Sequence, residues 1–168
     1  MSNAKPLNGV KILELSSVVT ASLATMILCD QGAEVIKVEP TGIGDSMRHL
    51  GTQKGGFSAI FSNCNRGKKS LNLNLKDQDE VKFLLSLVKE SDVFISNYRP
   101  GVNDRLGLGL KALRKINSKI IYVSILIFNL FVEEFFFKSV SVNNFEKSLL
   151  ASKQINKPNN KIDKIKIF

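Results

Sequence analysis

The chain has 168 residues, of which 43% are hydrophobic and 23% charged, and its formal net charge is +9. This length suits one domain with a proper core, and the composition is that of a globular protein rather than a disordered or fibrous one. The lysines are scattered, without an arginine-rich stripe or interleaved aromatic residues, so we expect no nucleic-acid partner. The positive charge indicates either a solvated basic surface or a phosphorylated ligand.

Neither a membrane nor a metal is expected as a partner. The start of the chain leads into Leu7 without an apolar signal region, and the longest apolar stretch, 120–132, is too short to cross a bilayer. A cytoplasmic location is therefore expected. Cys29 and Cys64 have neither the pattern of a disulfide framework nor metal-ligand spacing, and His49 is the only histidine.

Short apolar strands alternate with amphipathic helices along most of the chain. Gly32 ends the first predicted helix, and Pro40 with a glycine-rich loop ends the second predicted strand. Strand–helix–strand repetition at this spacing predicts an α/β fold, with a Rossmann-like parallel sheet and helices on its faces. The predicted strands are 10–15, 34–39, 71–75, 92–96 and 119–124, and the predicted helices are 20–31, 77–90 and 110–117.

The composition changes near residue 125. All 11 glycines lie between Gly9 and Gly109, whereas seven of the 11 phenylalanines lie in 126–168. This second segment is rich in Phe, Lys and Asn and has no clean periodicity. We therefore expect a first domain at 1–125, the N-terminal part of a larger domain. Residues 126–168 are expected to be an unrelated or poorly ordered tail.

The most informative motif follows the predicted strand 92–96. It is Asn97-Tyr98-Arg99-Pro100-Gly101, with Arg105 a few residues later. An aromatic face, an amide, a turn that exposes backbone N–H groups and two guanidinium groups suit a phosphorylated, ring-bearing ligand. An ordinary exit from a strand with surface arginines explains the motif equally well.

The motif of a dinucleotide site is missing. Residues 16–22, which follow the first predicted strand, contain no glycine, so the backbone there cannot approach a pyrophosphate closely in the usual way. Glu39 is interpreted as a strand-end residue rather than a ribose ligand. We therefore expect no nicotinamide cofactor.

Taken in order, several segments resemble the class III coenzyme A transferases. This family includes formyl-CoA and carnitine CoA-transferases and the related 2-methylacyl-CoA racemases. Each motif alone is weak, but the ordered set is specific. The segments that carry the resemblance are Pro6–Leu15, Ala24–Met26, Gly32–Glu39, Gly42–Asp45 with Arg48, Asn65–Ser70, Asn97–Gly101, Arg105–Gly109 and Ile120–Ile125.

The resemblance implies coenzyme A, carried as an acyl-CoA, as one substrate and a carboxylic acid as the other. It also implies a longer polypeptide that forms an interlocked homodimer. The family's CoA contacts carry over to positions after the first strand, near the third and after the fourth. The residues at these positions are Val19, Thr20, Leu73, Asn74, Leu75, Lys76, Asn97, Tyr98, Arg99 and Arg105.

The chain departs from the family pattern in two places. The family usually has Ala-Gly-Pro where this chain has Thr20-Ala21-Ser22, so a tight turn is expected to be lost. The family's nucleophilic aspartate lies beyond the strand that ends at Ile125, after a Gly-Phe-Gly-like loop and within a tyrosine- or histidine-aspartate pair. Here no such pair occurs, and the only aspartate beyond Ile125 is Asp163.

In the mechanism that the resemblance implies, this aspartate attacks the thioester and forms an acyl-aspartyl anhydride. The CoA thiolate released in this step attacks the anhydride, which frees the donor acid and leaves CoA on the aspartate as a thioester. The acceptor acid then attacks this thioester. We assign no catalytic residue, and we expect this chain to be inactive in CoA transfer by itself.

Three interpretations of the whole chain remain open. In the first, it is a truncated reading of a transferase gene whose residues 126–168 come from a shifted frame or fused sequence. In the second, it is a non-catalytic CoA-binding or regulatory module with a genuine tail. In the third, it is a fragment of a 2-methylacyl-CoA racemase. Translation of the two other frames beyond codon 125 distinguishes the first from the second.

Overall fold

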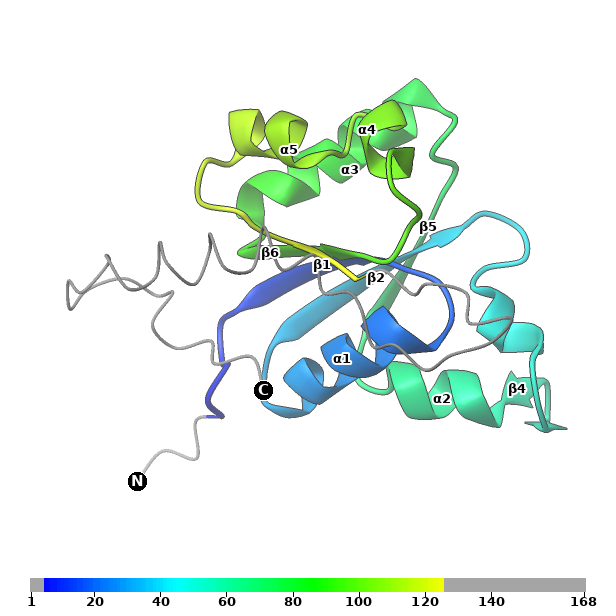
Figure 1. Cartoon of the computed structure of the whole chain (residues 1–168). Coiled ribbons are helices and arrows are strands. Elements are labelled where there is room, and N and C mark those ends of the chain that lie inside the picture. The colour runs from blue at the N-terminus through cyan, green and yellow to red at the C-terminus, as the bar shows by residue number, and fades with distance from the viewer. Residues whose placement is uncertain (1–4, 126–168) are drawn as a thin grey trace, which may run out of the picture. The chain divides into compact units, whose positions relative to one another are not determined.

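The structure, a computed structural model, describes residues 5–125 (Figure 1). The tail predicted at 126–168 lies outside the described residues, and the boundary at 125 stays a prediction. A five-stranded sheet has the order β5-β2-β1-β6-β7, and every neighbouring pair in it is parallel. Its strands are β1 (Lys11–Leu15), β2 (Glu34–Pro40), β5 (Lys69–Leu73), β6 (Val93–Ser96) and β7 (Ile121–Ser124).

Helices cover both faces of this sheet. Figure 1 shows α3, α4 and α5 on one face and α1 and α2 on the other. The helices are α1 (Val19–Asp30), α2 (Ala59–Asn65), α3 (Gln78–Glu90), α4 (Val102–Arg105) and α5 (Leu110–Ile116), with a short 3-10 helix η1 (Ser46–His49) and a hairpin of β3 (Gln53–Lys54) and β4 (Phe57–Ser58). The α/β fold with a parallel sheet and flanking helices is therefore confirmed.

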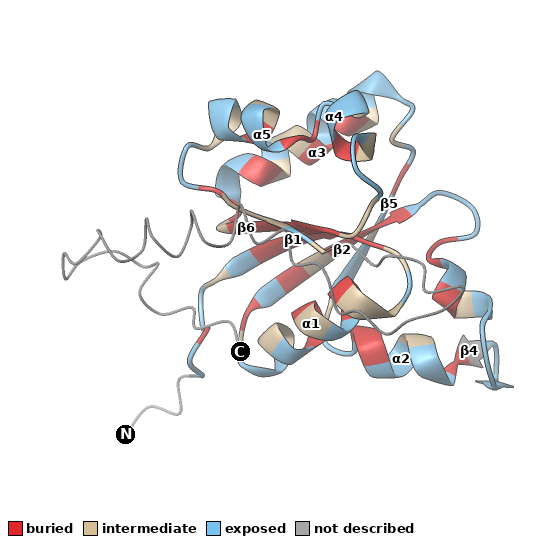
Figure 2. Cartoon of the chain, viewed as in Figure 1, coloured by how far each residue is buried: buried red, intermediate tan, exposed pale blue. Residues whose placement is uncertain are grey.

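Coverage of both faces explains why the central strands are buried almost throughout. All four residues of β6 are buried, as are four of the five residues of β1 (Figure 2). Parallel strands between two helical layers have no solvent-facing side, so their sequences become nearly continuous apolar runs. A cluster on these strands, α3 and α5 forms the main core; its members include Leu13, Leu15, Leu84, Val88, Phe94, Leu108 and Leu113.

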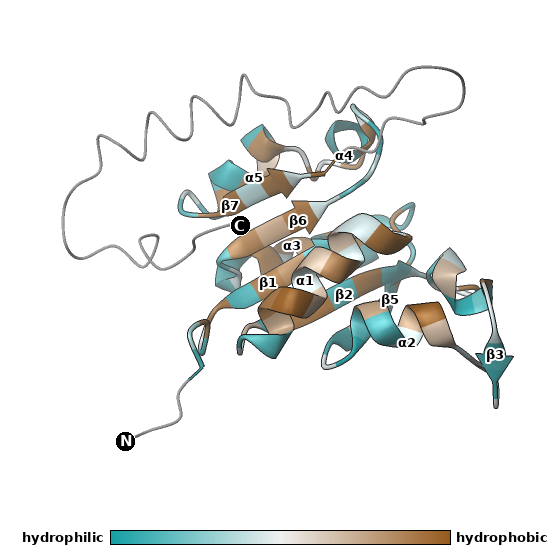
Figure 3. Cartoon of the chain, turned by 60° about the horizontal axis from the view of Figure 1, so that its bottom comes forward, coloured by the Kyte–Doolittle hydropathy of each residue, from teal (hydrophilic) through white to brown (hydrophobic). Residues whose placement is uncertain are grey.

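Local signals account for where the two longer helices begin and end. Asp77 caps α3, accepting hydrogen bonds from the backbone N–H groups of Asp79 and Glu80. Beyond α1, Gly32 adopts φ +104, a conformation that favours glycine. Helix α1 is apolar around much of its circumference (Figure 3). Its residue Leu23 remains 40% exposed.

Most predicted elements are confirmed, with small shifts. The third strand is Lys69–Leu73 instead of 71–75, because the chain turns after Leu73. There the backbone N–H of Asn74 donates to Glu80 Oε2 at 2.6 Å, which directs the chain into α3. Helices α2 and α4 and the β3–β4 hairpin were not predicted. The hairpin strands have two residues each and α4 has four, which is about one turn or less of periodicity.

Within residues 5–125, no helix has the length and hydropathy needed to cross a bilayer.

Candidate functional site at the carboxyl edge of the sheet

The order in which the chain adds strands to the sheet reverses between β1 and β6, although all the strands stay parallel. From β1 it continues to β2 and β5 on one side, and it then crosses back to β6 and β7 on the other. Ligands in open α/β sheets bind at such a switch point, outside the carboxyl ends of the strands. We call the loops that follow β1, β2, β5 and β6 the carboxyl edge.

An asparagine joins the two loops at the switch point. Asn97 Oδ1 accepts a hydrogen bond from the backbone N–H of Ser17 at 3.0 Å. Asn97 Nδ2 donates to the backbone carbonyl of the same residue at 2.6 Å. The amide is thus bonded at both ends inside the protein, so its main role in this structure is to hold the loops after β1 and β6 together.

The turn into α1 contains an unusual backbone conformation. Val18 has φ 64 and ψ −153, and it is the only residue other than glycine within 5–125 with a positive φ. This region is almost exclusive to glycine and costs about 1–3 kcal/mol when another residue occupies it. At Thr20–Ser22, where the family has Ala-Gly-Pro, the chain is helical, and the turn before α1 lies at Val18.

Asp45 lies under this turn and is 1% exposed. Its Oδ1 accepts hydrogen bonds from Val18 N and Ser17 Oγ, both at 3.2 Å, and from Met47 N at 2.9 Å. Its Oδ2 has no hydrogen bond among the described residues, but it lies 2.9 Å from Lys37 Nζ in an ion pair. One carboxylate therefore links the loops after β1 and β2.

Asp45 belongs to a buried charge cluster that consists of Glu14, Lys37, Asp45 and Lys68. Lys37 Nζ and Lys68 Nζ each lie 2.8 Å from an oxygen of Glu14, and these side chains are at most 2% exposed. Burial raises the pKa of Glu14, but the two lysine charges outweigh that effect and bring the pKa to about 2. Burial lowers the pKa of Lys68, and the charge of Glu14 offsets part of that shift.

Hydroxyl groups of α1 complete the hydrogen bonds of this cluster. Ser22 Oγ accepts from Lys37 Nζ at 2.9 Å and donates to Glu14 Oε1 at 3.2 Å. Thr25 Oγ1 donates to Glu14 Oε2 at 2.5 Å. Ser22 occupies the position where the family usually has proline, so the departure noted in the sequence places a hydroxyl against two buried charges.

A second buried carboxylate closes the loop after β2. Glu39 accepts from Arg48 Nε and Nη2, both at 2.7 Å, and from Ser70 Oγ at 2.7 Å. Burial raises the pKa of Glu39, and these hydrogen bonds, with that of the Asp45 N–H, lower it to about 2. The guanidinium of Arg48 also lies over the ring of Phe61, 3.9 Å from its centre. With its oxygens bonded in this way, Glu39 is a structural residue at a strand end, as the sequence predicts.

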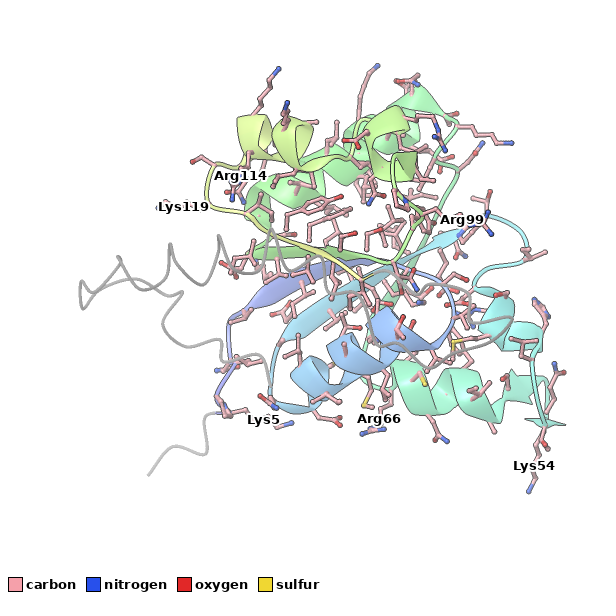
Figure 4. The ribbon with its side chains drawn as sticks, in the orientation of Figure 1. Lys5, Lys54, Arg66, Arg99, Arg114 and Lys119 are labelled. Carbon is pink, nitrogen blue, oxygen red and sulfur yellow. The ribbon has the colours of Figure 1, made fainter. Side chains whose placement is uncertain are left out.

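The structure brings the predicted CoA contacts to one edge of the sheet. Val19 and Thr20 begin α1, Leu73 ends β5 and 74–76 follow it, and 97–99 follow β6, with Arg105 at the end of α4. Because the strands are parallel, the loops that follow them share the carboxyl edge. Figure 4 shows Arg99 at this end of the sheet, with Arg114 and Lys119 at the opposite end.

The ten predicted residues differ in what they can offer a ligand. The side chain of Leu73 is part of the core, and Tyr98 packs against the same core cluster. Burial raises the pKa of the Tyr98 hydroxyl, and the nearby charge of Asp45 raises it further. Three of the ten are exposed cations: Lys76, Arg99 and Arg105. A direct contact of any of the ten residues with CoA stays a prediction.

The sequence contains no signal for the contacts within the buried charge cluster or for the strained conformation of Val18. Lys37 lies in the predicted strand 34–39, and Asp45 and Lys68 lie within segments that carry the family resemblance. The partners of these groups are far away in sequence, so local patterns contain no signal for them. Within residues 5–125, no group of three or more His, Cys, Asp or Glu side chains is placed to hold a metal ion.

Comparison with known proteins agrees with this architecture. The family model described as CoA-transferase family III matches residues 7–131. Acetyl-CoA:oxalate CoA-transferase of Acetobacter aceti is 44% identical over 119 residues, which cover 71% of this chain and 31% of the relative. Human succinyl-CoA:glutarate CoA-transferase is 47% identical over 126 residues, which cover 74% of this chain and 29% of the relative.

Solved structures show the same relationship. A CAIB/BAIF family protein from Brucella suis is 36% identical with a TM-score of 0.68, over 73% of this chain and 33% of that one. A hypothetical protein from Mycobacterium tuberculosis is 38% identical with a TM-score of 0.67, over 72% of this chain and 33% of that one. The chain spans only about a third of these proteins' lengths. On the match of its sequence and its fold, the chain belongs to CoA-transferase family III.

Proposed function

We propose that this chain binds the CoA part of an acyl-CoA at the carboxyl edge. The observation that carries this proposal is the convergence of three groups of predicted contacts, distant in sequence, beside the switch point of the sheet. CoA carries several phosphate groups, and Lys76, Arg99 and Arg105 are exposed cations at this edge. Loops that end parallel strands at a switch point are also where nucleotides commonly bind.

We further propose that the reaction of the longer protein is transfer of CoA between an acyl-CoA and a carboxylic acid. The relatives named above are CoA-transferases, which favours transfer over racemisation. Such transfer needs a carboxylate oxygen that attacks the thioester carbon, so that the C–S bond breaks and CoA leaves as the thiolate. The interlocked homodimer implied by the resemblance is part of the same proposal.

Asp45 does not suit the role of this nucleophile. Its side chain is 1% exposed, its Oδ1 accepts three hydrogen bonds and its Oδ2 forms an ion pair with Lys37, so a thioester carbon cannot reach either oxygen. Beyond residue 125 the only aspartate is Asp163, in a context that matches no family motif. We therefore propose that the 168-residue chain binds CoA without transferring it by itself.

Calorimetric titration of the chain with CoA tests the binding proposal. We expect Arg99→Ala and Arg105→Ala each to weaken binding by about fivefold, because each removes one charge-assisted contact with phosphate. Arg114→Ala is the matched control, since it removes the same charge from the opposite end of the sheet (Figure 4). The absence of heat with CoA, or an equal effect of Arg114→Ala, would contradict the proposal.

The transfer proposal needs a separate assay. The purified chain is incubated with an acyl-CoA and a labelled free acid, and the label in the CoA thioester is followed over time. We expect no exchange above the rate without protein. Exchange that depends on the chain would show that a nucleophile is present and would overturn the proposed inactivity.

A further inference from the structure

The strained turn at Val18 is held by a single carboxylate. Asp45 Oδ1 accepts from the N–H of Val18 and from the hydroxyl of Ser17, both at 3.2 Å. A β-branched residue persists at φ 64 only where its surroundings hold it there. We propose that Asp45 is a positioning residue, which keeps Val18 at positive φ and thereby orients the start of α1 towards the ligand. This inference rests on the proposed CoA-binding function.

The residue before Val18 is fixed from two directions. Asn97 bonds the backbone N–H and the carbonyl of Ser17 at 3.0 and 2.6 Å, while Asp45 binds the hydroxyl of the same residue. Rotation of Ser17 would break all three contacts. The freedom that remains in the turn is therefore concentrated at Val18, whose N–H is the next group that Asp45 binds.

Asp45 is itself held firmly enough to maintain such a conformation. Lys37 Nζ lies 2.9 Å from its second oxygen, and its own backbone N–H donates to Glu39 Oε2 at 2.9 Å. The residue is 1% exposed, so water does not compete for its oxygens. Lys37 is anchored in turn by Glu14, which connects the turn to the buried charge cluster.

The conformation of Val18 decides where the first turn of α1 lies. Val18 is the residue before the helix, and no side chain caps the N-terminus there. The N–H groups at Val19 and Thr20 belong to the first turn, where backbone donors lack partners within the helix. If Val18 relaxed to negative φ, Val19 and Thr20 would rotate relative to the rest of the carboxyl edge. Their N–H groups would then no longer point at an anionic ligand bound there.

A double-mutant cycle with CoA titration tests this inference in the full chain. Asp45→Ala should weaken CoA binding by about tenfold, since misplacement of a binding group by about an ångström has effects of this size or larger. Glycine adopts positive φ without support, so Val18→Gly should restore most of the affinity in the Asp45→Ala background. Val18→Gly alone should bind CoA within about threefold of the parent chain.

A general loss of stability is excluded by a control at the other edge of the sheet. Asn117 donates to the carbonyls of Val88 and Ser91 at 3.1 and 2.8 Å, so Asn117→Ala disturbs the fold before β7 begins. It should lower the melting temperature and leave CoA affinity unchanged while the chain is folded. Failure of Val18→Gly to restore affinity, or unchanged affinity in Asp45→Ala, would overturn the positioning role.

Melting temperatures test the same coupling without CoA. Release of strain by Val18→Gly should raise the melting temperature more in the parent chain than in Asp45→Ala, where the turn has already relaxed. Equal shifts in the two backgrounds would overturn the inference even if CoA binds.

No CoA binding by the parent chain would overturn the proposed function, while the melting cycle would still decide whether Asp45 holds Val18. If Asp45→Ala does not fold, Asp45→Asn replaces it in both cycles. We then expect non-additive changes of the same sign in CoA affinity and melting temperature, but smaller ones.

Discussion

Lys37 Nζ lies 2.8 Å from Glu14 Oε1, and neither side chain is more than 1% exposed. Glu14 of β1 and Lys37 of β2 are register partners in adjacent parallel strands, so the sheet itself sets the distance between their backbones. Their charges compensate each other away from water, where an unpaired charge is very costly.

Removal of one charge from this pair should be strongly destabilising. Glu14→Gln leaves Lys37 and Lys68 without the carboxylate that both contact, and we expect a loss of about 3–5 kcal/mol in the free energy of unfolding. Urea denaturation measures this loss. Lys82→Ala breaks an exposed pair with Asp79 and should cost less than about 1 kcal/mol. Similar losses in the two variants would contradict the assignment.

Acid should destabilise the chain between about pH 4.5 and pH 2. The pKa values of Glu14 and Glu39 are lowered from 4.5 to about 2 in the folded chain, so the unfolded chain binds more protons in this window. Stability from these groups is therefore fully present above pH 4.5 and is lost as the pH falls through the folded pKa. Urea midpoints at a series of pH values measure the slope, which should be shallower in Glu14→Gln. A flat profile would disprove this linkage.

Arginine at position 48 should not be replaceable by lysine. Arg48 bonds Glu39 through two nitrogens and lies over the ring of Phe61. Lysine provides one charged nitrogen without the planar group, so Arg48→Lys should cost about 1–2 kcal/mol. Phe61→Leu, which removes only the stacking, should cost less, about 0.5–1 kcal/mol. Chemical denaturation ranks the two, and the reverse order would show that stacking dominates.

Two glycines allow strain and contact to be separated. Gly42 has φ +88 with nothing within 4 Å of an added Cβ, whereas a Cβ on Gly67, at φ +78, would lie 2.9 Å from Cys29 Sγ. Gly42→Ala should cost about 1–2 kcal/mol from backbone conformation alone. Gly67→Ala should cost more, and Cys29→Ala in the same chain should recover the excess. Thermal unfolding measures both losses of stability. Equal losses in Gly42→Ala and Gly67→Ala would mean that Cys29 Sγ moves away from the added Cβ without cost.

Periodicity was enough to predict the sheet. Strand β6 is a short apolar run and β5 alternates apolar and polar residues, while α3 has its apolar residues at helical spacing. These features depend only on neighbours in sequence. Where β5 ends was not predictable in the same way. Leu75 continues the alternation of Leu71 and Leu73, but the bond from Asn74 to Glu80 turns the chain before Leu75 can join the strand.

The sequence was enough to predict which loops form the candidate site. It was not enough to predict the buried ion pairs that hold these loops in place. The segment 97–101 stands out because amide, ring and guanidinium are adjacent in sequence. Lys37 is a charged residue in the predicted strand 34–39, yet this strand is covered on both sides and the lysine is buried. What makes this burial tolerable is the position of Glu14 and Asp45, which only the folded chain brings together.

The bond between Asn97 and Ser17 depends on the amide having two different ends. One end accepts from a backbone N–H, and the other donates to a backbone carbonyl. Hydrolysis of this amide to a carboxylate during long storage would keep the acceptor and set a negative oxygen against the carbonyl of Ser17. A single event of chemical ageing would therefore weaken the junction between the two loops at the switch point, and freshly prepared protein is the proper material for ligand studies.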